Sequence, residues 1–292
     1  MNMKQNSQKI LIMSLLGLLI TILFGRNGYM SQIVCRMMIS ACLACGLDIC
    51  VGIAGQLSLG HAVFMAVGAY SCAVVTEWLS GRASVGVSFG LATVLSGLFA
   101  FVVGYLILGL RGDYLAVCTL GMGETVRVFL ENADFLGGAG GFYNIPKFTS
   151  SAGAYVMFVI CLCISMFFST SRSGFLARTV GQDEYASGSI GVNIRMTKVK
   201  AFVISAIVTA IAGVMYAGLL GFISPRDFGY SRSVDILAAV ILGGSGTVVG
   251  PMLAAMCIEG FFAVFQSASV FRMVLYSLAL IVFTIQKYRR RG

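Results

Sequence analysis

The few side chains that could take part in chemistry stand mostly inside apolar stretches of this sequence. The only histidine, His61, closes the segment 52–61, which reads GIAGQLSLGH and also carries Gln56 and Ser58. Its glycines weaken helix continuity, and irregular backbone at membrane depth survives only where protein buries it or water reaches it. The segment therefore predicts either a broken helix beside a translocation path lined by Gln56, Ser58 and His61, or a tight turn whose histidine bonds to a neighbouring helix.

Ionisable residues also stand inside apolar stretches, where a charge needs a partner. They are Arg36, Asp48, Glu77, Glu124, Arg127, Glu259 and Arg272. Glu124 and Arg127 are three residues apart, so they can pair on one face of a helix. Because Glu124 stands in mid-stretch, we expect its carboxylate either to face the same path or to form a structural ion pair.

Other chemistry finds little support in the sequence. The spacings of Cys42 with Cys45 and of Cys161 with Cys163 imitate metal sites, but neither pair has a second pair or a histidine nearby. We therefore interpret the cysteines as small apolar residues and expect no metal. The GGAGG run at 137–141 is not a phosphate-binding GxxxxGK[ST] loop. No enzyme active site is expected, and any ATP and Mg²⁺ must be bound by another chain.

The elements that hold these residues follow from the composition. Hydrophobic residues make up 58% of the chain and charged residues only 11%, against about 25% charged in globular proteins. The fold class predicted is an all-α polytopic membrane protein with a single transmembrane domain, 1–292, that binds lipid and no nucleic acid. A span needs about 20 apolar residues, which predicts helices at 10–24, 31–53, 59–79, 85–109, 114–131, 153–169, 199–223, 234–248, 250–266 and 270–286. Because two of these are short, the expected number is about eight to ten.

Lysine and arginine predict the orientation. They concentrate before the first predicted span, in the segment 171–200 and after the last span. Positive residues in short loops mark the cytoplasmic side, so both termini and the loop 171–198 are expected in the cytoplasm. A second glycine-rich interruption, LGGSGTVVGP at 242–251, predicts another broken segment, near 243–251.

Five stretches taken together resemble one family. They are VGIAGQLSLGHAVFMAVGAY (51–70), LRGDYLAVCTLGMGETVRVFLEN (110–132), the central loop through GVNIRMTKVKAFVISA, GFISPRDFGYS and ILGGSGTVVGP. In this order they resemble the LivM-type permease subunits of bacterial ABC importers for branched-chain amino acids. The resemblance implies half of a pore in the cytoplasmic membrane, paired with a second, related permease chain. It also implies two cytoplasmic ATPase subunits, which bind the ATP and Mg²⁺, and an extracytoplasmic substrate-binding protein.

The central loop resembles the coupling element that docks on the ATPases in this family. A helix over 178–189, ended by glycines, is expected there, with Glu184 and Arg178 making ion pairs at the rim of the contact. The family pattern Glu-Ala-Ala followed by glycine is met by Glu184, Ala186 and Gly191, whereas Tyr185 takes the middle place. The coupling residues expected are Arg178, Gln182, Asp183, Glu184, Ala186, Gly188 and Gly191.

Two other interpretations of a transporter remain open. Permeases for urea, amides or other amino acids share these motifs. An ion-coupled secondary transporter would instead use Glu124 with Arg127, or Asp48, as its ion site.

Overall fold

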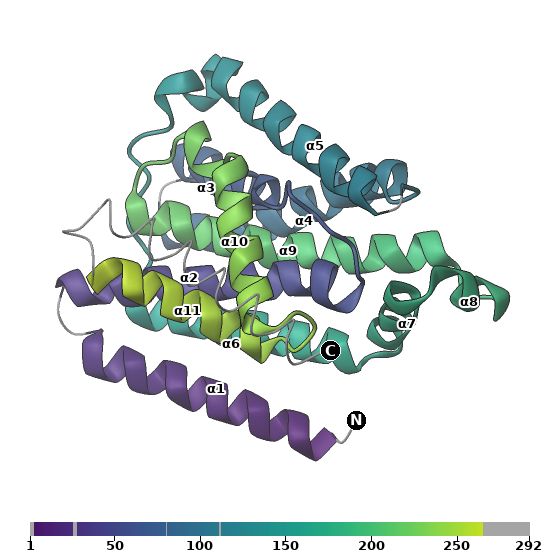
Figure 1. The fold of residues 1–292 in the computed structure, drawn as a ribbon. Helices are drawn as coiled ribbons and strands as arrows, with labels where there is room; N and C mark the ends of the chain where they lie inside the picture. The colour runs from purple at the N-terminus through teal and green to yellow at the C-terminus, as the bar shows by residue number, and fades with distance from the viewer. Residues whose placement is uncertain (1–2, 26–27, 80, 111, 265–292) are drawn as a thin grey trace.

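The computed structural model describes residues 3–25, 28–79, 81–110 and 112–264, and their regular structure is helical (Figure 1). The predicted span 270–286 lies outside these residues. The longer helices are α1 (Met3–Phe24), α2 (Gly28–Asp48), α3 (Ala62–Trp78), α4 (Arg82–Ile107), α5 (Asp113–Asn132), α6 (Ser151–Thr170), α7 (Arg172–Gln182), α9 (Ile194–Leu220), α10 (Tyr230–Gly243) and α11 (Val249–Val264). The short ones are η1 (Ile49–Ile53), η2 (Asp134–Leu136), η3 (Gly138–Gly140), α8 (Glu184–Ser189) and η4 (Pro225–Phe228).

Each of the other predicted spans overlaps with one of these helices, although 234–248 runs past the end of α10 and 250–266 extends beyond the described residues. The all-helical class is confirmed. Within the described residues, four stretches are long and apolar enough to cross a membrane: Gly28–Ile53, Ala83–Ile107, Ser151–Thr170 and Ile194–Leu220. Leu11–Leu23, Ala62–Trp78 and Val249–Ala263 are apolar but shorter. Charged residues interrupt α5, and α10 has only 14 residues. The predicted number of eight to ten spans therefore stays a prediction.

Helix α9 runs through the middle of the fold, with α2, α3 and α4 packed against it (Figure 1). Small residues allow the close approach of α3 to α9. A Cβ on Gly68 would collide with the carbonyl oxygen of Ala210, and a Cβ on Gly213 would collide with that of Met65. The backbones of α3 and α9 thus touch directly at two levels.

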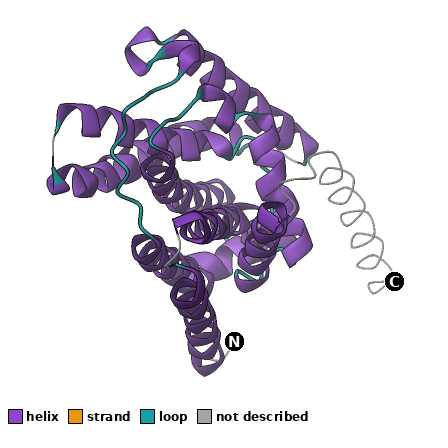
Figure 2. Cartoon of the chain, turned by 90° about the vertical axis from the view of Figure 1, so that its left-hand side faces the viewer, coloured by secondary structure: helices purple, strands orange, loops and turns teal. Residues whose placement is uncertain are grey.

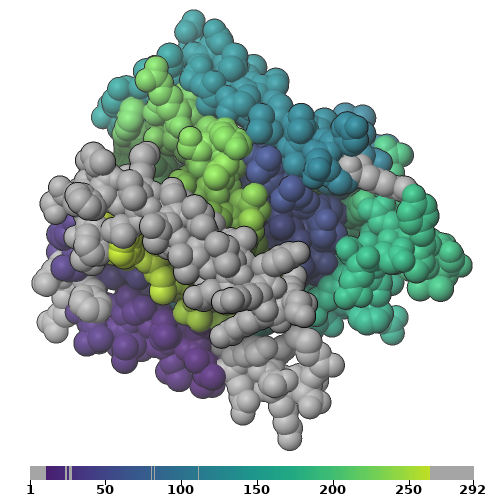
Figure 3. Space-filling view, viewed as in Figure 1, coloured from purple at the N-terminus to yellow at the C-terminus, as the bar shows by residue number. Residues whose placement is uncertain are grey.

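The two ends of the bundle differ. Helices α7 and α8 project at the end where α1 begins (Figure 1). At the other end the segment 141–150 crosses the bundle from α5 towards α6, as the end-on view shows (Figure 2). There Phe142 pairs with Ile223 through two backbone hydrogen bonds of 2.8 and 3.1 Å. Helices α5 and α10 lie next to each other on one face (Figure 3).

Candidate functional site

The first glycine-rich segment interrupts the path of the chain from α2 into α3. Helix α2 continues as the π-helical turn η1, and residues 54–61 are irregular until α3 begins. The break is therefore shorter than the predicted 52–61, since Gly52 is still helical. Side chains from distant helices hold its backbone: Leu59 donates to the Thr119 hydroxyl at 3.0 Å, and Ala62 donates to that of Ser233 at 3.1 Å.

The three polar side chains of this break are all buried, and each leaves an atom without a partner in the described structure. His61 Nε2 lies 3.0 Å from the Ser205 hydroxyl, which donates its proton to the Gly46 carbonyl at 2.5 Å. Because a hydroxyl has one proton, Ser205 accepts from Nε2–H and leaves His61 Nδ1 as a bare acceptor. Nδ1, Gln56 Nε2 and Ser58 Oγ are buried without hydrogen-bond partners. The bond to Ser205 agrees with the turn interpretation, whereas the orphaned atoms favour a polar path.

The second glycine-rich segment is fastened to the end of α2 by a buried carboxylate. Helix α10 ends at Gly243 and α11 begins at Val249, so the irregular part is 244–248 and not the whole of 243–251. Asp48, the last residue of α2, accepts from the backbone N–H of Gly246 at 2.6 Å and from that of Val248 at 2.9 Å. The φ of Val248 is +60°, which a β-branched residue rarely adopts. Asp48 therefore holds a strained turn of the second break against the end of α2.

Helix α7 touches both breaks. The Arg178 guanidinium donates to the Ser169 hydroxyl at 2.6 Å and to the Gly246 carbonyl at 3.5 Å. Gly246 thus donates its N–H to Asp48 in a short hydrogen bond, and its C=O accepts a longer and weaker one from Arg178. At the first break, Gly181 packs so closely that a Cβ there would lie 2.9 Å from the carbonyl carbon of Ala54. We call this set of contacts among Asp48, Arg178, Gly181 and the two breaks the inner junction.

The coupling segment is two helices where one was expected over 178–189. Asp183 is extended (φ −151°, ψ 108°) and ends α7. Its carboxylate accepts from the backbone N–H groups of Tyr185 and Ala186 at 2.8 and 3.0 Å, and so caps α8. Aspartate favours such N-cap positions over helix interiors, which explains the division. Gly191, with φ +83°, follows the end of α8 as predicted, whereas Gly188 lies within that helix.

Two charged side chains of this segment are bound within the chain, and the expected rim ion pairs with a partner stay a prediction. Glu184 makes an ion pair with Lys198 of α9, whose side chain is only 6% exposed. Arg178 is bound to Ser169 and Gly246. The exposed surface of α8 and its flanks is instead uncharged apart from Asp183; it consists of Gln182, Asp183, Tyr185, Ala186, Gly188, Ser189, Ile190 and Gly191.

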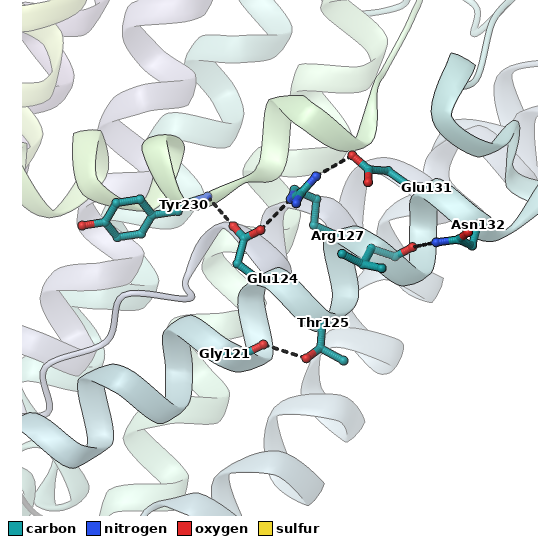
Figure 4. A network of polar contacts seen from close by, with 8 residues as sticks. Gly121, Glu124, Thr125, Arg127, Glu131, Asn132 and Tyr230 are labelled. Atoms are coloured by element: carbon teal, nitrogen blue, oxygen red, sulfur yellow. Dashed lines mark hydrogen bonds and ion pairs between the residues drawn. The ribbon is translucent and has the colours of Figure 1, made fainter.

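Glu124 lies on α5, and its carboxylate is bound by a side chain of the same helix and by the start of α10. Its carboxylate accepts from Arg127 Nε at 2.7 Å and from the backbone N–H of Tyr230, at the start of α10, at 3.1 Å (Figure 4). Arg127 also donates to Glu131 at 2.5 Å. The expected pairing of Glu124 with Arg127 is confirmed, and negative charge at a helix N-terminus is favourable. The path role of Glu124 stays a prediction.

Sequence reasoning missed the roles of Asp48 and Gly246. Asp48 stood out as an acid in an apolar stretch, but its partners lie 198 and 200 residues further on. Successive backbone N–H groups in glycine-rich turns form anion-binding concavities. On that ground, Asp48 could have been proposed as the partner of the glycine-rich turn at 242–251.

Comparisons with known proteins point to one family of permeases over most of the chain. The family model described as branched-chain amino acid transport system, permease component, matches residues 29–284. The high-affinity branched-chain amino acid transport system permease protein LivM of Escherichia coli (strain K12) is 32% identical over 288 residues, covering 85% of this chain and 66% of LivM. The chain thus spans slightly less than two thirds of that relative.

More distant relatives match shorter parts. The corresponding permease protein LivH of Salmonella typhimurium is 24% identical over 171 residues, 57% of this chain and 55% of LivH. The autoinducer 2 import system permease protein LsrC of Enterobacter sp. (strain 638) is 35% identical over 94 residues, 27% of each chain. No solved structure matches the chain.

Proposed function

Because the chain belongs to the family of permease components of branched-chain amino acid transport systems, we propose that it forms half of the pore of an ATP-driven importer. The importer carries branched-chain amino acids through a bacterial cytoplasmic membrane, in which both termini of the chain face the cytoplasm. A second permease chain completes the pore, since this chain is similar to both LivM and LivH. Two ATPase subunits bind ATP and Mg²⁺, and an extracytoplasmic binding protein delivers the amino acid.

The observation that carries this proposal is the inner junction. Arg178 and Gly181 of α7 contact the second and the first break respectively. Asp48 holds the second break against the end of α2, which leads through η1 into the first break. A displacement of α7 by a bound ATPase therefore acts at once on the two places where the helices are interrupted. Rigid-body rocking of helices about such points is one known form of alternating access.

Docking on the ATPase is assigned to the exposed, mostly uncharged surface of α8. Tyr185 and Ile190 are about three-quarters exposed, at 74% and 75%, and aromatic residues are enriched at the cores of protein interfaces. Gln182 and Ala186 lie on the same short segment. Gly191, with its positive φ, allows the tight turn into α9, and Gly188 keeps the surface of α8 free of a side chain. Arg178, Asp183 and Glu184 fix the shape of the segment from inside and transmit its movement.

The path is assigned to the first break. Each buried polar group without a partner costs about 1–3 kcal/mol, so Gln56, Ser58 and His61 would gain stability from water or a polar solute. In the proposed cycle the break opens to the cargo when α7 moves. Glu124 contributes by holding the start of α10 rather than by touching the cargo.

The test is uptake of labelled L-leucine by liposomes that contain this chain, its partner permease and the two ATPases, with the binding protein outside and ATP inside. Uptake should require ATP, and Gly191→Trp should abolish it, because a bulky residue blocks docking and strains a backbone with positive φ. Gly121→Ala is the control, since a Cβ there meets open space. ATP-independent uptake by this chain alone, driven by a proton or sodium gradient, would establish the secondary transporter instead. Uptake of urea or an amide in place of leucine would identify the other cargo.

A further inference from the structure

A cavity at the opposite end of the fold from α7 and α8 gathers charged residues from three helices. It lies among α2, α10 and α11, has a volume of about 350 Å³ and is lined by Arg36, Arg232, Asp235 and Glu259. We call it the outer cavity. Charged residues are rare in apolar helices and mark binding or transport sites when they face a cavity. The volume lies at the lower end of the range for small-molecule sites, about 300–1,000 Å³.

The cations of this cavity are only partly used. Arg232 Nη1 lies 3.5 Å from Glu259 Oε1, beyond the usual 2.7–3.2 Å of a good N–H···O bond. The same oxygen accepts from the Ser40 hydroxyl at 2.7 Å. Arg232 Nε is buried without a partner in the described structure. Arg36 is exposed to the cavity and makes no hydrogen bond or ion pair with another described residue. Two guanidinium groups thus have capacity for a further acceptor.

The charge balance selects the kind of ligand. Two arginines and two carboxylates cancel, so the cavity suits a solute without net charge that carries both signs. Arginine matches a carboxylate bidentately, and Asp235 and Glu259 match an ammonium group. Apolar side chains, among them Ile236, Ile258 and Phe262, complete the wall. A neutral amide or urea carries neither a carboxylate for the arginines nor an ammonium group.

We propose that the outer cavity binds a free α-amino acid with an apolar side chain. Arg36 and Arg232 bind its carboxylate, Asp235 and Glu259 its ammonium group, and the apolar wall its side chain. This inference rests on the proposed function and deepens it, because it places a cargo site in the permease itself. In the proposed orientation the cavity lies on the extracytoplasmic side, where a binding protein releases its amino acid.

The location also connects this site to the inner junction. Within helix α2, the distance along the axis from Arg36 to Asp48 is roughly 18 Å, at 1.5 Å per residue. Helix α10 carries Arg232 near its start and ends at Gly243, where the second break begins. The same two helices therefore line the outer cavity at one end and meet at Asp48 and Gly246 at the other. An amino acid that draws the two cations together acts on helices that end at the coupling contacts.

The experiment measures binding to the complete reconstituted importer without its binding protein, using labelled L-leucine. Two competitors each lack one charge: isopentylamine has no carboxylate, and 4-methylpentanoate has no ammonium group. Isocaproamide serves as the neutral amide. Leucine should bind at least tenfold more tightly than each of the three, about 1.4 kcal/mol. Equal binding of leucine and the amide would overturn the inference without any mutation.

Variants give the second measurement. Arg36→Gln and Glu259→Gln should each weaken leucine binding and ATP-driven uptake at least tenfold. Arg226→Gln, an exposed cation at the same end of the fold but outside the cavity, should leave both unchanged. Assembly and ATPase activity in detergent show that each variant is folded. If the wild-type importer takes up leucine and both cavity variants match it, the cavity inference is wrong and the proposed function stands. If the wild type takes up no amino acid, the proposed function fails first.

Discussion

The inner junction and the outer cavity use charged residues in opposite ways. At the junction the Asp48 carboxylate is fully buried and takes two short backbone hydrogen bonds, of 2.6 and 2.9 Å. In the cavity the Arg232–Glu259 contact is 3.5 Å long, and Arg36 has no hydrogen bond or ion pair with a described residue. Tight pairing fixes distant segments against each other, whereas loose pairing leaves capacity for a ligand. We therefore assign a structural connection to the inner junction and ligand binding to the outer cavity.

Removal of Asp48 should have the largest effect. Asp48→Ala leaves two buried N–H groups without an acceptor, at about 1–3 kcal/mol each, so the free energy of unfolding should fall by roughly 2–6 kcal/mol. It should also free the strained turn at Val248. Thermal unfolding of the purified chain in detergent measures the loss. Asp48→Asn keeps one acceptor oxygen, so its Tm should lie between that of Asp48→Ala and that of the wild type. A Tm of Asp48→Ala equal to that of the wild type would remove the junction as a structural connection.

Much of the fold was predictable, because it follows from local patterns. Apolar runs of sufficient length gave helices in the described chain, and glycines marked both breaks. The Glu124–Arg127 pair followed from its spacing along one helix.

The connections between these elements were not predictable in the same way. Asp48 and Gly246 lie almost 200 residues apart, and no local pattern links them. The division of the coupling helix depends on Asp183 acting as a cap, a role that competes with its place inside a helix. The inward pairing of Glu184 depends on where α9 begins. From the sequence alone, Lys198 could equally anchor the helix at the membrane surface. Long-range contacts require the packed fold.

The ion pair between Glu184 and Lys198 extends the junction into the coupling segment and should have the next largest effect. Glu184→Lys places two cations together near a buried site, and we expect a loss of about 1–3 kcal/mol and weaker assembly with the ATPases. The reversed pair, Glu184→Lys with Lys198→Glu, should recover most of both. Copurification of the tagged permease with its ATPases measures assembly. If the reversed pair stays as defective as the single variant, Glu184 acts on the partner surface and not on Lys198.

A smaller effect is expected at the contact between α7 and the first break. Gly181→Ala places a Cβ 2.9 Å from the Ala54 carbonyl carbon, so α7 must shift, at about 1–2 kcal/mol for such overpacking. We expect ATP hydrolysis to continue while leucine uptake falls severalfold. The ratio of uptake to hydrolysis in proteoliposomes measures this loss of coupling. Gly121→Ala adds the same methyl group to a helix without a contact and should keep the wild-type ratio. An unchanged ratio of uptake to hydrolysis in Gly181→Ala would show that coupling does not depend on the contact of Gly181 with the first break, and would leave only Asp48 and Arg178 in the junction.

The outer cavity should show the smallest effect on stability, although it has the larger role in binding. Arg36→Leu removes a cation that has no hydrogen bond or ion pair among the described residues, so the free energy of unfolding should change by less than about 0.5 kcal/mol. Binding sites commonly hold groups that do not stabilise the empty protein. Unfolding curves with and without L-leucine separate the two quantities: the wild type should gain stability from leucine and the variant should not. A destabilisation as large as that of Asp48→Ala would show that Arg36 is structural, and the contrast between the two regions would disappear.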